Sequence, residues 1–238
     1  MSLHDLFLII HLLLFVYWLG GDLGVFYSSG MVIDPSLSNE ARVTAAKIMV
    51  NLDLVPRICM SLMLTVGGVL SELIGIEHPT WQMAGIILLG PAWLTMVLFI
   101  HLNEGKPINK TVTRVDYIFR WILVIYLLAS VGYSFATGRL SEAPWYGAKL
   151  AVFAGLVFCG LMIRKFIPDY AIGIHKLATG PVTDEDNRAM SRSLAQCRPF
   201  VIAIWVGILV EVFLGVVKPG GEQATGVLSS LFTLANIG

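Results

Sequence analysis

Residues 81–101 read WQMAGIILLGPAWLTMVLFIH and contain no Asp, Glu, Lys or Arg. A helix needs about 20 apolar residues to cross the hydrocarbon core of a bilayer, and this stretch is long enough. Five further apolar runs occur along the chain, and the six predicted spans are residues 5–28, 48–71, 81–101, 112–137, 144–164 and 199–218. We therefore expect an all-α, polytopic bundle of about six transmembrane helices that forms a single transmembrane domain over residues 1–238.

The composition of the whole chain favours the same class. Of its 238 residues, 56% are hydrophobic and 13% are charged, and the mean hydropathy is +0.78. Soluble domains carry about 25% charged residues. The net charge is zero and no basic stretch is interleaved with aromatic residues, so we expect the lipid bilayer, and no nucleic acid, as a partner. The cysteines Cys59, Cys159 and Cys197 form no CxxC motif, and the two that lie inside apolar runs are expected to be small packing residues.

Basic residues are distributed unevenly between the two ends of the predicted spans. Arg139 and Lys218 flank the side that carries both termini. The connections between spans one and two, three and four, and five and six hold the other flanking basic residues, namely Arg42, Lys47, Lys106, Lys110, Arg114, Arg164, Lys165, Lys176, Arg188, Arg192 and Arg198. The positive-inside rule predicts that both termini are outside and that the protein is a multi-pass protein of a bacterial-type inner (plasma) membrane. The Gly-rich tail from Pro219 is too short to span and is expected on the surface.

Three ionisable residues occupy similar depths in the outer half of the predicted bundle. At a rise of about 1.5 Å per residue, His11, Lys149 and Glu211 lie about 9, 7 and 9 Å below the outer surface. Gly207 and Gly215 flank Glu211 at four-residue spacing and should let a neighbouring helix approach it closely. Because ionisable groups are costly in lipid, we expect the three to share one polar pocket, with Lys149 and Glu211 as catalytic candidates.

A second set of charges lies in the inner half. Asp53 and Arg57 are four residues apart on one predicted helix, and Asp116 and Arg120 are four apart on another. This spacing predicts structural ion pairs along each helix face, although a proton or ion path would use the same residues. Asp22 is at a depth that could join them.

Helix 1 carries a candidate ligand for a metal or haem. His4, His11, Trp18 and Asp22 recur at helical spacing and should share one face. Neutral imidazole is the usual axial ligand of a membrane haem, so His11 is the candidate metal ligand, although an interhelical hydrogen bond is equally consistent with its position. Trp18 would pack against a cofactor or a neighbouring helix, and His78 is the candidate second ligand because it lies on the same side.

Three short motifs resemble the HemJ-type protoporphyrinogen oxidases, which belong to a broader group with the CopD-like copper-resistance membrane proteins. They are HLLLFVYWLGG (residues 11–21), WYGAKL (residues 145–150) and VVKP (residues 216–219). The resemblance implies a membrane helical bundle associated with haem b, with His11 as a haem ligand and Lys149 as a site residue. Gly147 and Gly160 stand where the family carries histidines, so the resemblance implies a related fold rather than the same reaction.

Three functions follow from these observations. The first is a membrane-embedded, b-haem-binding (cytochrome-like) subunit, a possible membrane oxidoreductase component for electron transfer or for oxidation of a lipid-soluble substrate. The second is a non-catalytic membrane anchor or assembly subunit with a protein partner in a larger membrane complex, whose buried charges hold helices together. The third is a CopD-like copper transport protein that uses outer Met and His side chains.

Overall fold

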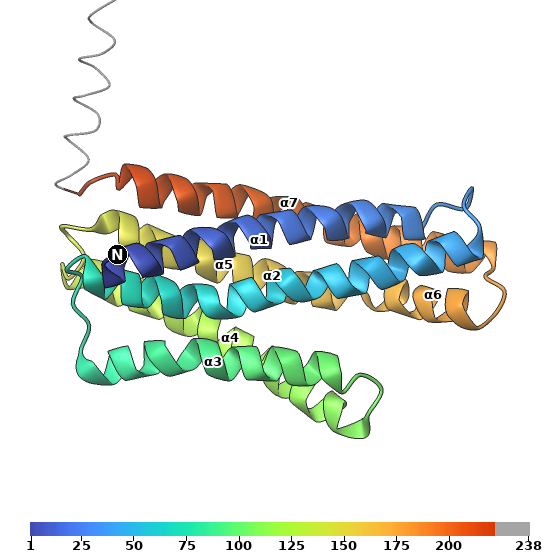
Figure 1. Ribbon diagram of the computed structural model, residues 1–238, viewed down its shortest axis with the longest axis horizontal. Coiled ribbons are helices and arrows are strands. Elements are labelled where there is room, and N and C mark those ends of the chain that lie inside the picture. Colours follow the sequence, from blue (N-terminus) through green and yellow to red (C-terminus); the bar gives the residue numbers. More distant parts are fainter. Residues whose placement is uncertain (222–238) are drawn as a thin grey trace, which may run out of the picture. The chain divides into compact units, whose positions relative to one another are not determined.

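Residues 1–221 of the chain are described in a computed structural model, and they form seven α-helices without a strand (Figure 1). The helices are α1 (Leu3–Val32), α2 (Asn39–Leu73), α3 (Thr80–Leu102), α4 (Pro107–Ala136), α5 (Pro144–Phe166), α6 (Pro168–Thr179) and α7 (Asp184–Val217). All of them except α6 are long and apolar enough to cross a membrane. The predicted all-α membrane bundle is therefore confirmed, whereas the tail expected on the surface lies mostly outside the described residues.

Polar caps at the helix ends satisfy backbone groups that the helices cannot pair internally. Ser2 and Asp5 form a capping box at the start of α1, in which each side chain accepts a hydrogen bond from the other residue's backbone N–H. The Ser38 side chain accepts from the Ala41 N–H at the start of α2. Between these helices, the Asp34 carboxylate accepts hydrogen bonds from the backbone N–H and the hydroxyl of Ser36, which lower the pKa of Asp34. The connection between α1 and α2 is thus a short, well-hydrogen-bonded turn.

Two helices extend far beyond the apolar runs that predict them. The second predicted span begins at residue 48, but α2 begins at Asn39. Likewise, α7 begins at Asp184 and continues through Pro199, where the predicted span begins. Proline removes one backbone hydrogen bond but does not end a helix whose other bonds persist.

The described residues divide into two compact units, each of which is described by itself. The first unit comprises residues 1–117 and 163–201, and the second comprises residues 118–162 and 202–221. The helices α4, α5 and α7 contribute one part to each unit. Within the first unit, α2 packs against α1, α3 and α6.

Small residues set the close packing of α2 in the first unit. A Cβ at Gly21 of α1 would meet the Pro56 ring of α2 at 2.8 Å, so only glycine allows this approach. On the opposite side, the Thr65 hydroxyl donates to the Ile86 carbonyl of α3 at 2.5 Å and accepts from the Gly90 N–H at 2.8 Å. These contacts fix α2 between its two neighbours.

The end of the first unit that carries its basic residues has a core of its own, formed where α6 lies beside the start of α2 (Figure 1). Its buried members are Val32, Ala45, Ala46, Tyr170, Leu177, Met190 and Leu194. The buried Arg42 donates to the Val32 carbonyl and to the Asn187 side chain, each at 2.7 Å. The Tyr170 hydroxyl donates to the Ser29 carbonyl at 3.0 Å, and burial raises the pKa of this phenol. The residues between the fifth and the last span therefore form a packed helical cap. We use the name basic-end cap for this cap, whose core is the set of buried residues given above.

The second unit depends on close contact between α5 and α7. A Cβ at Gly207 of α7 would lie 2.6 Å from a methyl carbon of Leu156 on α5, so the glycine is needed for this approach. Trp121 of α4 meets Phe158 of α5 edge to face, with ring centroids 5.9 Å apart. The predicted role of Gly207 in bringing another helix close to Glu211 is confirmed, and that helix is α5.

The location of the termini stays a prediction, which reporter fusions can test. Fusions after Lys110 and after Arg139 should report opposite sides of the membrane, with the first inside and the second outside, because the basic residues cluster at the end that carries Lys110. Alkaline phosphatase and a fluorescent protein provide complementary readouts at each position. Finding both fusions on the same side would overturn the six-span topology.

Candidate functional site

The second unit holds a buried ion pair between α5 and α7. The Lys149 Nζ lies 3.1 Å from Glu211 Oε2 and donates to the backbone carbonyl of Glu211 at 2.9 Å. The two side chains are 19% and 17% exposed. A Cβ at Gly215 would lie only 3.2 Å from the Lys149 Nζ, so the second flanking glycine leaves room for the ammonium group. The contact between Lys149 and Glu211 is present, while their catalytic role stays a prediction.

The Glu211 carboxylate has contacts besides Lys149. Its Oε1 is buried, and the carboxylate also interacts with the backbone of Phe153 on α5. One turn before Lys149 on α5, the Trp145 ring faces the ammonium of Lys218 at 5.5 Å from its centroid. A buried carboxylate oxygen beside an ammonium group can accept a proton or a hydrogen bond from a substrate. The arrangement thus places a carboxylate and an ammonium group, two groups that can exchange protons, in contact and mostly buried.

His11 lies in the first unit, where α1 packs against α2. A Cβ at Gly67 of α2 would lie 3.3 Å from the His11 Cε1, so the glycine leaves the space that the imidazole fills. The His11 Nδ1 is buried, and Trp18, two turns further along α1, is 3% exposed. His4 differs, since its side chain is 41% exposed and lies beside Asp5. The predicted face of α1 is thus covered at His11 and Trp18 but open at His4.

His78 is held by a carboxylate at the end of α2. Its Nδ1 lies 2.8 Å from Glu72 Oε2, which also accepts from the His78 backbone N–H at 2.9 Å. The His78 side chain is only 3% exposed. A carboxylate that fixes one imidazole nitrogen is the usual support for a histidine that binds metal through the other. Sequence reasoning missed Glu72, although a Glu six residues before a loop histidine was a visible signal.

The inner charges of the first unit are paired. Asp53 and Arg57 form the predicted ion pair along α2. Asp116 is fully buried, its Oδ2 lies 2.6 Å from the Arg164 Nη1, and its Oδ1 accepts from the Trp93 Nε1 at 3.1 Å. Arg164 and Trp93 were not predicted as partners of Asp116, because they come from α5 and α3 and no spacing links them. The predicted pair of Asp116 with Arg120 stays a prediction.

These inner charges interact beyond their immediate pairs. The Asp22 carboxylate on α1 interacts electrostatically with Asp53 and Arg57. The Arg164 guanidinium interacts with the same two groups in addition to Asp116. Three carboxylates and two guanidiniums of the first unit therefore form one network, which includes the residue that the sequence placed at this depth on α1.

The predicted pocket shared by His11, Lys149 and Glu211 stays a prediction, because His11 belongs to the first unit and the ion pair to the second. Among the described residues, no group of three or more His, Cys, Asp or Glu side chains is arranged to hold a metal ion. Comparisons with protein-family models, curated proteins and solved structures found no match to this chain.

Proposed function

We propose that the chain is a membrane-embedded, b-haem-binding, cytochrome-like subunit that transfers electrons or oxidises a lipid-soluble substrate in a bacterial-type inner membrane. The observation that supports this function best is the His11 imidazole inside the span of α1, set against Gly67, where any other residue would crowd the ring. An imidazole in an apolar span is the common axial ligand of b-type haem. Bound haem would supply one-electron transfer at this position.

The other residues then have separate roles. His11 is the proposed ligand, and the buried Trp18 packs beside it on the same face of α1. His78, oriented by Glu72, is the proposed second ligand. Lys149 and Glu211 exchange protons with the substrate, because the Glu211 carboxylate and the Lys149 ammonium are 3.1 Å apart and mostly buried. The inner network maintains the helix packing of the first unit.

The absorption spectrum of the purified protein tests this proposal. We expect a Soret band in the wild-type protein that His11→Ala weakens or shifts, because the variant removes the residue that would hold the haem iron. His4→Ala is the matched control, since it removes an exposed histidine from the same helix and should leave the spectrum unchanged. A colourless wild-type protein, purified from cells supplied with a haem precursor, would contradict haem binding.

A non-catalytic anchor or assembly subunit is the second candidate, and the charge pairing favours it. Asp53, Asp116 and Glu211 each have a cationic partner within their own unit, so these charges can stabilise helix packing without any chemistry. This function predicts a colourless protein whose His11→Ala variant still folds. Co-purification of a partner protein with both the wild type and that variant would support the anchor function over the redox function.

A further inference from the structure

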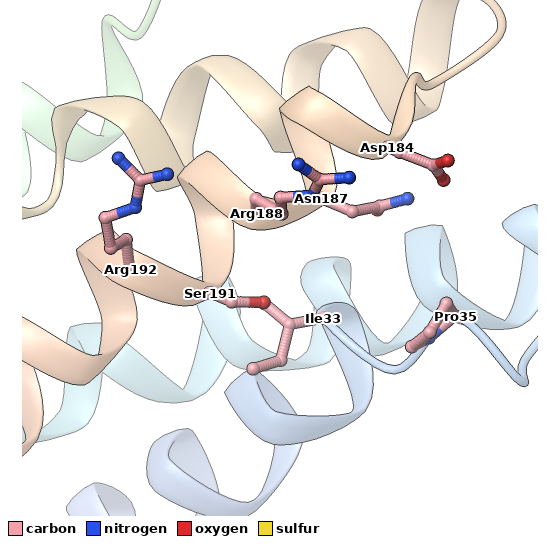
Figure 2. Close-up of a pocket in the computed structure, with 7 residues that line it drawn as sticks. All are labelled: Ile33, Pro35, Asp184, Asn187, Arg188, Ser191 and Arg192. Atoms are coloured by element: carbon pink, nitrogen blue, oxygen red, sulfur yellow. The ribbon is translucent and has the colours of Figure 1, made fainter.

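A groove of about 660 Å³ lies at the basic end of the first unit, between α7 and the connection from α1 to α2 (Figure 2). Ile33 and Pro35 form its apolar side. Arg188, Ser191 and Arg192 contribute from α7, and both arginine side chains extend to the same side of that helix (Figure 2). The groove thus combines a small apolar surface with two guanidinium groups and a hydroxyl group.

The two arginines are not neutralised by the protein. Arg188 and Arg192 are exposed, and neither forms an ion pair or a side-chain hydrogen bond within residues 1–221. The nearby acid Asp186 is occupied, because it pairs with Lys176 and accepts hydrogen bonds from Thr183. Asp184 lines one end of the groove and is its only carboxylate among the described lining residues. Two cations and one anion leave a net charge of +1.

Hydrogen bonds tie the two walls of the groove together. Asn187, which also lines the groove, accepts a hydrogen bond from the buried Arg42 at 2.7 Å. The same Arg42 donates to the Val32 carbonyl at the end of α1. These bonds join the segment of α7 that carries both arginines to the segment that carries Ile33 and Pro35.

The groove lies outside the predicted spans, near the headgroup layer of a membrane. Arg192 and Arg188 precede the predicted start of the last span, at residue 199, by seven and eleven residues, or about 10 and 16 Å of helix. Ile33 follows the predicted end of the first span, at residue 28, by five residues, or about 7.5 Å. The headgroup layer occupies about 5–8 Å outside the hydrocarbon core. The backbone of both arginines therefore lies beyond this layer, and their long side chains would reach back toward it.

We propose that this groove binds the phosphate group of an anionic phospholipid from the adjacent leaflet. Guanidinium groups bind phosphate oxygens through charge-assisted hydrogen bonds, and Ser191 offers a further hydroxyl donor. The net charge of +1 suits the single negative charge of a phosphodiester such as that of phosphatidylglycerol. Ile33 and Pro35 would contact the glycerol and the first acyl carbons. This site is independent of the proposed haem function.

Native mass spectrometry of the purified full-length chain, titrated with phosphatidylglycerol in detergent, tests the proposal. We expect one saturable lipid whose Kd rises about tenfold in the double variant Arg188→Ala/Arg192→Ala, since each basic residue contributes to anionic lipid binding. The double variant Lys106→Ala/Lys110→Ala is the matched control, because it removes two exposed charges at the same spacing outside the groove. Its Kd should stay unchanged. If the arginine variant does not fold, Arg192→Gln alone should still raise the Kd measurably.

Three outcomes would overturn this site. The first is an unchanged Kd in a folded arginine variant. The second is an equal loss of lipid affinity in the lysine control, which would indicate that lipid binding depends on the general surface charge and not on this groove. The third distinguishes the source of the phosphate. If glycerol phosphate displaces the lipid at equal concentration, the groove serves a soluble phosphate ester, whereas a lipid site should favour phosphatidylglycerol strongly. Phosphatidylcholine, which has no net charge, should compete poorly.

Discussion

Replacing Asp116 with Leu should lower the free energy of unfolding by about 3–5 kcal/mol, as is typical when one partner of a buried ion pair is removed. Asp116 is fully buried, forms an ion pair with the Arg164 guanidinium and accepts a hydrogen bond from the Trp93 indole N–H. The substitution leaves both donors without this acceptor in an apolar region. Unfolding by sodium dodecyl sulfate in mixed micelles, followed by far-UV circular dichroism, measures the change.

A double-mutant cycle separates the ion pair from other effects of the substitution. The double variant Asp116→Leu/Arg164→Met should recover much of the lost stability, because it removes both charges together. Any loss in the free energy of unfolding that remains in the double variant would measure the contribution of other partners of Asp116. Arg120 is the partner that the sequence predicts. The Lys176–Asp186 pair, in which the lysine side chain is 48% exposed, is the control, and its cycle should show weaker coupling because solvent screens the ammonium charge. A double variant as unstable as the sum of both singles would show that Asp116 and Arg164 do not compensate each other.

Removing Lys149 should destabilise the protein more than removing the Glu211 carboxylate. Lys149→Met should lower the free energy of unfolding by about 3 kcal/mol, because it leaves the buried Glu211 carboxylate without its cation. Glu211→Gln should cost less, about 1 kcal/mol, because Lys149 keeps its hydrogen bond to the Glu211 backbone carbonyl at 2.9 Å. The asymmetry follows from this second contact, which a simple side-chain ion pair would lack. The same detergent unfolding assay provides both values.

Two controls test the origin of this asymmetry. Lys149→Arg keeps the positive charge and should restore part of the stability that Lys149→Met loses. Gly215→Ala should also destabilise the protein, since its Cβ would crowd the Lys149 Nζ at 3.2 Å. If Lys149→Met and Glu211→Gln lower the free energy of unfolding equally, the hydrogen bond from Lys149 to the Glu211 backbone carbonyl does not contribute to stability as expected.

The fold was largely predictable from the sequence, and its limits have a physical cause. Apolar runs show where helices enter lipid, so all six spans were found. They do not show where helices end in water, so the predicted second span began at residue 48 whereas α2 begins at Asn39. Helix α6 was not predicted, because the small core of the basic-end cap joins residues distant in sequence.

The candidate site was predictable only where spacing within a helix carries the information. Asp53 and Arg57 pair along one helix, as their four-residue spacing indicates. The contact of Lys149 with Glu211 followed from equal depth and from flanking glycines. The partners Trp93 and Arg164 of Asp116 come from different helices, and only tertiary packing brings them together. Position along a helix is thus readable from sequence, whereas the rotation of one helix against another is not.

The anchoring of Arg42 has a consequence for synthesis at the ribosome. This buried guanidinium binds the Asn187 side chain, 145 residues later in the chain. At a translation rate of about 5–20 residues per second, the nascent chain carries Arg42 for roughly 7–30 s before Asn187 is made. During that interval the hairpin of α1 and α2 has no basic-end cap. The Ser29 carbonyl likewise has no Tyr170 hydroxyl from which to accept its hydrogen bond until Tyr170 is made. The N-terminal hairpin must therefore persist in an unfinished form, with its cationic end hydrated, until the last third of the protein emerges.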